Sequence, residues 1–291
     1  MIRRVGVIAK RGLTAAVPHL ERVVEWLVNK GVEPVLETET AALIDGTRRV
    51  ASASRDALPL AVDLLVVLGG DGTLLSVADR IGDAGCDTPI LGVNFGRLGF
   101  LTEVTLPELL PALESALAGT AMVHERAMLR VTALRDSQRL AEHVVLNDVV
   151  VTRGTISRLI YLAVFVDDLF VTNVKADGLI IATPTGSTAY NLAAGGPIVH
   201  PDVEALVVTP IAPHSLGNRP IVVPGHASIT VRAAADHGRG EVYVTFDGQT
   251  VVAFDTGDEL VVRPAERPLR LLGSPTRGYY DTLREKLRWG D

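Results

Sequence analysis

The stretch from Leu64 to Thr73 reads LLVVLGGDGT, an apolar run that stops at two glycines, an aspartate and a third glycine. The apolar residues are typical of a strand buried on both faces, and the helical spacing that follows predicts a strand, a tight turn and a helix start. Glycines allow backbone conformations closed to other residues and a close approach to a ligand, and the N–H groups of a helix start attract anions. The junction therefore predicts a phosphate-binding loop made of Gly69, Gly70, Asp71, Gly72 and Thr73.

Asp71 is the unusual member of this loop, because a carboxylate beside phosphates is repulsive unless it binds a cation or accepts a proton. Both roles point to phosphoryl transfer. Short glycine-rich turns also occur where a helix only packs on a sheet, so this motif alone leaves a structural and a functional interpretation open.

The segments around this junction alternate between strand and helix patterns. Strands are predicted at Val5–Ala9, Val35–Glu37, Val62–Leu68 and Ile90–Val93, and helices at Ala16–Lys30 and Leu106–Leu117. Such alternation indicates a parallel sheet with right-handed crossovers. We therefore predict that residues 1–120 form an α/β domain with a parallel, Rossmann-like sheet, which binds the phosphate donor.

The pattern changes after Glu125, where short alternating segments rich in β-branched residues follow one another. Strands are predicted at Leu129–Leu134, His143–Arg153, Tyr161–Val166, Leu179–Ala182, Leu206–Thr209, Ile229–Arg232, Glu241–Phe246 and Glu259–Arg263. Residues 121–269 are therefore predicted to form an all-β, sandwich-like domain. The last segment, residues 270–291, contains a predicted helix at Tyr279–Trp289 and is expected to pack back on the first domain.

Composition excludes several classes of protein. Hydrophobic residues make up 47% of the 291 residues and charged residues 21%, which is typical of a compact globular chain. The net charge of −6 and the lack of a basic cluster argue against nucleic acid as a partner. A single cysteine excludes an intrachain disulfide, and no apolar stretch approaches the length of a membrane span or signal peptide. We expect a cytoplasmic protein without a membrane partner and without a protein-bound metal site.

Three further polar motifs point to a ligand. Asn147-Asp148 interrupts the apolar strand VVLNDVVVTRG, where two polar side chains need partners or a function. The stretch Thr183–Tyr190, TPTGSTAY, crowds hydroxyl groups into one loop after Lys175 and Asp177. The loop NFGRLGFL, Asn94–Leu101, follows a strand of the first domain and should line the same cleft as the glycine turn. In that loop Phe95 is expected to cover a base or sugar and Arg97 to meet a phosphate, whereas Leu98 and Phe100 are expected in the core.

In their order and spacing, these motifs resemble the NAD kinases. The resemblance spans roughly residues 62–250 and includes the loop Pro210–Pro224, PIAPHSLGNRPIVVP. The resemblance implies phosphorylation of the 2′-hydroxyl of the adenosine ribose of NAD, by ATP or another donor, to give NADP. It implies Mg²⁺ carried with the donor, and a homodimer or homotetramer in which the Ala212 loop can act across a subunit boundary. Residues 121–269 would then bind NAD.

The resemblance also assigns roles to single residues. Asp71 matches the general base, and Asn147 and Asp148 match contacts to the ribose and the nicotinamide side. The remaining residues of the implied NAD site are Gly72, Phe95, Arg158, Lys175, Asp177, Thr188, Ala189, Tyr190, Asn191, Leu192, Ala193, Ala212 and Gln249.

Two alternatives are weighed against this assignment. A lipid or sphingoid kinase shares a Gly-Gly-Asp-Gly-Thr loop, but Asn147-Asp148 and the TPTGSTAY loop suit a polar dinucleotide better. A non-catalytic NAD(H)-binding regulator would keep the substrate loops without needing Asp71. The sequence does not distinguish ATP from other nucleotides or polyphosphate, NAD from NADH, or dimer from tetramer, and it is silent on feedback by NADP(H).

Overall fold

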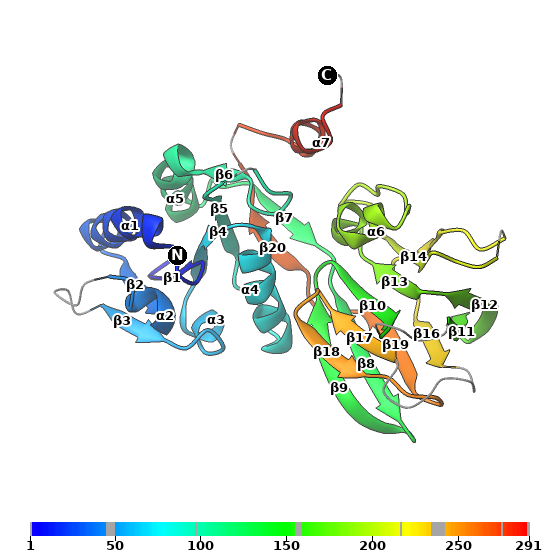
Figure 1. Ribbon diagram of the computed structural model, residues 1–291. Helices are drawn as coiled ribbons and strands as arrows, with labels where there is room; N and C mark the ends of the chain where they lie inside the picture. Colours follow the sequence, from blue (N-terminus) through cyan, green and yellow to red (C-terminus); the bar gives the residue numbers. More distant parts are fainter. Residues whose placement is uncertain are drawn as a thin grey trace. The chain divides into compact units, whose positions relative to one another are not determined.

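The computed structural model describes residues 2–44, 50–96, 98–154, 159–215, 217–233, 242–274 and 276–289. The chain divides into two units (Figure 1). Unit 1 contains Met1–Glu125 and Leu269–Asp291, and unit 2 contains Arg126–Pro268.

Unit 1 is built on one sheet, with the strand order β3-β2-β1-β4-β5-β20-β7 and β6 paired with β5. Its central pairs are parallel, as β1 with β2 and β4, and β5 with β4, β20 and β6. The strands are β1 Arg4–Ala9, β2 Glu33–Glu37, β3 Ala51–Ala53, β4 Leu64–Gly69, β5 Ile90–Asn94, β6 Val104–Thr105, β7 Val123–Arg126 and β20 Leu269–Leu272. The prediction of an α/β domain with a parallel sheet is confirmed.

Helices cover both faces of this sheet, because its strands are apolar on both sides. The helices are α1 Val17–Asn29, α2 Thr38–Ala41, α3 Leu58–Ala61, α4 Asp71–Asp83, α5 Leu109–Ala118 and α7 Tyr279–Leu287, with short 3-10 turns at Thr14–Ala16 and Leu106–Glu108. One face packs in a single core with α1 and α5, through residues such as Leu20 and Leu113. The other face lies against α3 and α4, where Leu58 approaches Gly6 and Leu74 approaches Gly92. A Cβ at either strand position would press on these side chains.

The C-terminal segment returns to unit 1. β20 pairs in parallel with β5, through Leu271 with Ile90 and Leu272 with Leu91, and can be followed in orange beside the central strands in Figure 1. α7 then follows β20 within unit 1.

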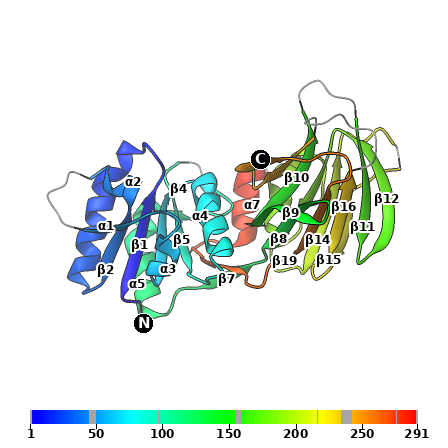
Figure 2. The ribbon, with the colours of Figure 1, turned by 90° about the horizontal axis from the view of Figure 1, so that it is seen from below.

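Unit 2 consists of two six-stranded sheets, whose strands can be followed in Figure 2. Their orders are β15-β14-β13-β10-β17-β18 and β12-β11-β16-β19-β8-β9. One apolar core joins them, since Val149 and Ile181 of the first sheet cluster with Val131 and Leu260 of the second. The predicted all-β, sandwich-like domain is therefore confirmed.

Most predicted segments of unit 2 correspond to strands, but β12, β15 and β18 were not predicted. They are β8 Leu129–Arg135, β9 Gln138–Val145, β10 Asp148–Arg153, β11 Ile160–Val166, β12 Leu169–Ala176, β13 Gly178–Ala182, β14 Ala205–Ile211, β15 Ile221–Pro224, β16 Ile229–Ala233, β17 Val242–Phe246, β18 Thr250–Ala253 and β19 Glu259–Pro264. A 3-10 turn at Thr185–Thr188 and the short helix α6 Tyr190–Ala193 follow β13.

The single strand predicted at His143–Arg153 is wrong. β9 ends at Val145 and β10 begins at Asp148, and the two strands belong to different sheets. The chain therefore bends at Leu146 and Asn147 as it passes from one sheet to the other. An unbroken apolar run hides such a crossing, because both strands face the shared core.

No described helix is long and apolar enough to cross a membrane.

Candidate functional site

The turn after β4 leads through Gly70 into Asp71, the first residue of α4. Gly70 is extended, with φ −125° and ψ −175°, and neither Gly69 nor Gly72 has a positive φ. The expectation that these glycines adopt conformations closed to other residues is therefore wrong. Only Gly69 is needed for its small size, because a Cβ there would press on the Thr73 side chain, whereas a Cβ at Gly70 or Gly72 would meet no atom within 4 Å. The turn leaves open space beside the N–H groups that begin a helix, where an anion can approach.

The carboxylate of Asp71 reaches across to the loop that follows β5. Its Oδ2 accepts a hydrogen bond from the Phe100 N–H at 2.8 Å. Its Oδ1 accepts three, from Leu101 N–H at 3.2 Å, Thr102 N–H at 3.0 Å and the Thr102 hydroxyl at 2.9 Å. A Cβ at Gly99 would collide with the same carboxylate. Asp71 thus holds two of the predicted loops together, in addition to any chemical role.

The loop after β5 is itself well anchored. The Phe95 N–H donates to the Gly69 carbonyl at 3.1 Å, and the Asn94 side chain donates to Thr102 at 2.9 Å and accepts from the Gly96 N–H at 2.6 Å. The half-buried Phe95 ring lies 5.4 Å from His19 of α1, edge to face. Leu98 is buried, as expected, but Phe100 is only half-buried. Arg97 lies outside the described residues.

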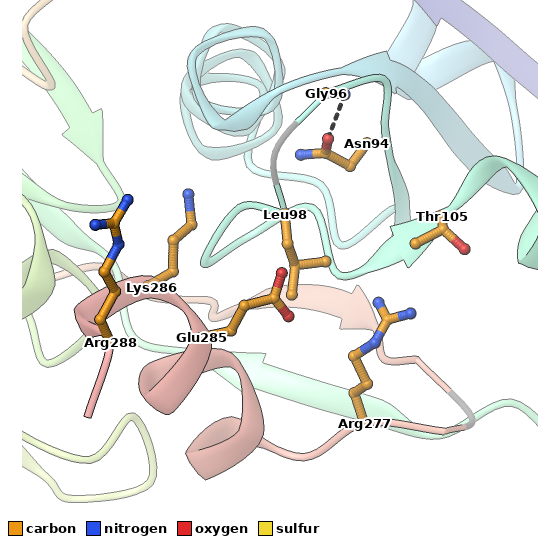
Figure 3. A pocket seen from close by; sticks show the side chains of 8 residues that line it. All are labelled: Asn94, Gly96, Leu98, Thr105, Arg277, Glu285, Lys286 and Arg288. Atoms are coloured by element: carbon orange, nitrogen blue, oxygen red, sulfur yellow. Dashed lines mark hydrogen bonds between the residues drawn. The ribbon is translucent and has the colours of Figure 1, made fainter. Parts of the chain in front are cut away.

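A cavity of about 560 Å³ opens beside this loop (Figure 3). It is contained in unit 1, and its lining combines the end of β5 and the following loop with the C-terminal segment. The lining residues are Asn94, Gly96, Leu98, Thr105, Arg277, Glu285, Lys286 and Arg288.

In unit 2, Asn147 and Asp148 occupy the bend between β9 and β10. They do not interrupt one strand as predicted, because Asn147 lies in the bend after β9 and Asp148 begins β10. Asn147 is half-buried, and no hydrogen bond of its side-chain amide is recorded within the described part of the chain. Its backbone carbonyl accepts from the Thr183 N–H at 2.9 Å, which ties the bend to the TPTGSTAY loop.

A half-buried carboxylate shapes this bend. Asp247, in the β17–β18 hairpin, accepts hydrogen bonds from three consecutive backbone N–H groups: Leu146 at 2.7 Å, Asn147 at 2.8 Å and Asp148 at 2.9 Å. The Asp247 N–H donates back to the Asp148 carbonyl at 3.0 Å. None of the sequence motifs pointed to this contribution of Asp247.

The two acids at the bend have unusual protonation behaviour. Burial, followed by repulsion from Asp247, raises the pKa of Asp148 to about 7. The pKa of Asp247 is also raised, because burial outweighs the three backbone N–H groups that favour its charged form. A carboxyl group that is partly protonated near neutral pH can donate as well as accept a hydrogen bond, which suits the recognition of a hydroxyl.

The TPTGSTAY loop is mostly buried, and its hydroxyl groups bind the protein itself. Thr183 donates to the Leu146 carbonyl at 2.6 Å, and Ser187 donates to the Pro184 carbonyl at 2.6 Å. Asn191 is fully buried; its amide donates to the Ser187 and Pro197 carbonyls and accepts from Thr209 at 2.6 Å. These groups shape the loop, whereas Thr188, Ala189 and the 44% exposed Tyr190 lie nearer its surface.

Four other predicted residues lie around the strands of unit 2. Lys175 Nζ lies 5.1 Å from the Tyr161 ring centre, and Asp177 forms an ion pair with Arg153 at 3.1 Å. Ala212 has a φ of 44°, just after β14, and Gln249 lies in the hairpin that carries Asp247. Arg158 lies outside the described residues. Leu192 and Ala193 belong to the short helix α6.

The structure adds residues that the motifs did not reveal. Thr102 and Gly99 complete the surroundings of Asp71, and Asp247 organises the Asn147 bend. Gly186 is required beside this bend, because a Cβ there would collide with the Asn147 backbone. A sequence signal existed only for Gly99 and Gly186, which stand inside quoted motifs.

Known families and proteins match the chain over nearly its whole length. The ATP-NAD kinase N-terminal domain matches residues 5–121, and the ATP-NAD kinase C-terminal domain matches residues 146–273. The NAD kinase of Geotalea daltonii is 47% identical over 290 residues, and that of Syntrophotalea carbinolica is 46% identical over 290 residues. Both alignments cover 100% of this chain and of the relative.

Two solved structures are similar as well. Yeast NADH kinase, crystallised in complex with NADH, matches with a TM-score of 0.91 at 27% identity, over 100% of this chain and 89% of that one. An NAD kinase from Archaeoglobus fulgidus, in complex with ATP, matches with a TM-score of 0.74 at 28% identity, over 97% and 99% of the two chains. On its sequence, its fold and both domain matches, the chain belongs to the ATP-NAD kinase family.

Proposed function

We propose that this chain transfers a phosphoryl group from ATP to the 2′-hydroxyl of the adenosine ribose of NAD and so forms NADP, with Asp71 as the general base. Family membership makes it an NAD kinase, a phosphotransferase. The observation that supports the role of Asp71 is its position in a turn whose flanking space is open. A carboxylate beside an anion site is useful when it removes the proton of an attacking hydroxyl.

The two oxygens of Asp71 are not equivalent. Oδ1 accepts three hydrogen bonds from residues 101–102, whereas Oδ2 accepts one, from Phe100. A carboxylate oxygen has two lone pairs, so Oδ2 retains acceptor capacity. We therefore assign Oδ2 as the atom that accepts the 2′-hydroxyl proton, while Oδ1 fixes the orientation of the carboxylate. The rate gain comes mainly from this alignment.

We propose that the bend of unit 2 binds NAD. The amide of Asn147 and the carboxyl of Asp148 would hold hydroxyl groups of the dinucleotide in one orientation. Additional contacts are proposed for Gly72, Phe95, Arg158, Lys175, Asp177, Thr188, Ala189, Tyr190, Asn191, Leu192, Ala193, Ala212 and Gln249. Because the polar atoms of Asn191 are already bonded to protein, its contribution would be to shape the loop.

The divalent ion is proposed to arrive with the donor. Among the described residues, no group of three or more His, Cys, Asp or Glu side chains could hold a metal ion. The described residues therefore offer no dedicated metal cage, and Asp71 is the carboxylate at the phosphate turn. When bound to ATP, Mg²⁺ neutralises charge on the phosphates.

We also propose a homodimer or homotetramer in the cytoplasm, without nucleic acid or membrane partners. β12 is an edge strand of its sheet and carries three exposed apolar side chains, Leu169, Phe170 and Val171. An exposed apolar edge strand is a natural surface for pairing with a second copy. Light scattering after gel filtration would test this assembly, and Phe170→Lys should shift it toward the monomer.

The kinase assay incubates purified protein with NAD and Mg-ATP and detects NADP with a coupled, NADP-specific dehydrogenase. The wild type should form NADP. Asp71→Asn should keep NAD binding, measured by calorimetry, and lose turnover by about 100-fold or more, as expected when a general base is removed. Asp83→Asn, at the far end of the same helix, serves as the matched control.

The outcomes separate three interpretations. Unchanged turnover in Asp71→Asn would remove the base role and leave Asp71 as a loop anchor. Thr102→Val removes the hydroxyl that donates to Asp71 and accepts from Asn94, so it reports the effect of loosening this loop without removing the Asp71 carboxylate. If the wild type binds NAD but forms no NADP with any donor, the chain acts as an NAD(H)-binding regulator.

A further inference from the structure

The cavity of unit 1 has an unbalanced charge. Its lining contains three cationic side chains, Arg277, Lys286 and Arg288, and one carboxylate, Glu285. Arg277 is already engaged, because it donates to the Glu103 carbonyl at 2.9 Å and lies 3.4 Å from Glu108. No carboxylate partner is recorded for Lys286 or Arg288 in the part of the chain that the structure describes. Positive charge is therefore available in a chain whose net charge is −6.

The end of α7 places these two cations together. Residues two apart on a regular helix do not face each other. α7 ends at Leu287, however, and Arg288 has a left-handed φ of 53°. Figure 3 shows the side chains of Lys286 and Arg288 extending from this end in the same direction.

An ordinary explanation for basic residues here is the partial negative charge at a helix C-terminus. It accounts equally for Arg284, which is paired with Asp281 and does not line the cavity. It does not account for the cavity of about 560 Å³ beside Lys286 and Arg288. The volume of this cavity lies within the size range of small-molecule sites.

The cavity is also linked to the phosphate turn. Lys286 Nζ lies 5.9 Å from the centre of the Phe100 ring. The backbone N–H of the same Phe100 donates to Asp71 Oδ2 at 2.8 Å. The ligand crevice of an open α/β sheet lies at the carboxyl ends of its strands, and Asn94, which ends β5, lines this cavity.

We propose that this cavity binds the polyphosphate chain of the phosphoryl donor, and that Lys286 and Arg288 are the residues that attract it. The proposal rests on the proposed kinase function and extends it to the C-terminal helix. The chemistry recognised is a chain of linked phosphates, whether it belongs to a nucleoside triphosphate or to inorganic polyphosphate. A flexible ammonium and a planar guanidinium suit such a chain, since the first acts as a point charge and the second binds two oxygens at once.

The test measures steady-state kinetics of Lys286→Ala, Arg288→Ala and the double variant, with Mg-ATP and with inorganic polyphosphate as donors. Each single variant should raise the KM for the donor about tenfold, the effect of losing one charge-assisted contact, and leave the KM for NAD unchanged. Glu285→Gln should act in the opposite direction and lower the donor KM. Arg284→Ala, on the same helix, is the control and should change none of these values.

The two donors identify the source of the phosphate chain. A rise in KM for both donors supports a site for phosphates alone, and a rise for one donor supports the proposal with that donor as its ligand. An unchanged KM for both donors in the double variant overturns it. A parallel rise in the KM for NAD also overturns it, because the substitutions would then disturb the whole site.

A binding measurement keeps this proposal separate from the kinase function. Calorimetric titration of inorganic tripolyphosphate into the wild type and the double variant needs no turnover. Tighter binding by the wild type supports the site even if no NADP forms, and equal binding overturns it. Thermal unfolding of both proteins verifies that the double variant is folded.

Discussion

Replacing Asp148 by asparagine should stabilise the protein at neutral and alkaline pH. The side chain is 5% exposed, and its pKa rises from 3.8 to about 7 in the folded protein. Because this folded pKa is raised, the folded state holds the proton more tightly than the unfolded state does. The associated stability is complete below the unfolded pKa and is lost as the pH rises through the folded pKa.

The size of this loss follows from the shift. About 3 pKa units at about 1.4 kcal/mol each correspond to about 4 kcal/mol in total. Between about pH 5 and pH 8, the wild type should therefore lose about 3 kcal/mol of unfolding free energy through Asp148. Asp148→Asn does not ionise, and it also removes the repulsion that Asp247 experiences. Its stability should fall less over the same interval.

Urea unfolding at the two pH values, for wild type and Asp148→Asn, measures this difference directly. Asp168→Asn is a suitable control, because Asp168 is exposed and lies in another hairpin turn of the same unit. If the wild type and Asp148→Asn lost the same unfolding free energy between the two pH values, the Asp148 carboxylate would not be the source of the pH dependence. A gain in stability together with weaker NAD binding would indicate that Asp148 is kept for function.

Three further substitutions test other contacts. Gly99→Ala places a Cβ against the Asp71 carboxylate and should reduce turnover more than NAD affinity. The coupled assay measures turnover and calorimetry measures affinity. Equal effects on both would contradict a selective displacement of Asp71. Asp247→Ala leaves three backbone N–H groups at the bend without their acceptor and should lower the unfolding free energy by about 2–4 kcal/mol. Asp168→Ala is its matched control, because Asp168 has a positive φ as Asp247 does, and should cost only about 1 kcal/mol. Arg135→Gln removes the guanidinium that binds Asp258, whose side chain is 1% exposed. It should lower the free energy of unfolding, measured in urea, by about 2 kcal/mol. A loss below about 0.5 kcal/mol would mean that Asp258 finds another partner.

The sequence predicted the parallel sheet of unit 1 well, because buried strands such as β4 have unbroken apolar runs with turn residues at their ends. It failed at Asn147, where one apolar run contains two strands of different sheets. The spacing of apolar residues indicates which side chains are buried. Side chains remain buried when the chain crosses from one sheet to the other around the same core, so the spacing does not reveal the crossing.

The site was predicted unevenly for a related reason. Motif residues that are close in the chain, such as Gly69 to Thr73, could be identified together. Asp247 lies about 100 positions from the bend that it supports, and Thr102 lies 31 positions from Asp71. Contacts of this kind depend on the tertiary fold, and local sequence patterns carry no signal for them. The cations at the end of α7 were overlooked for the same reason.

The return of the C-terminal segment to unit 1 has a consequence for the order of events during synthesis. β20 lies inside the sheet of unit 1, between β5 and β7, yet it leaves the ribosome after all of unit 2. Unit 2 is a contiguous segment and can fold first as a complete body, whereas the sheet of unit 1 stays open at β5 until Leu269–Leu272 emerges. The cavity beside Asn94 is therefore among the last parts of the molecule to form. A ribosome-bound chain that stops before Leu269 would contain the glycine turn and the NAD-binding bend, but not the cations of α7.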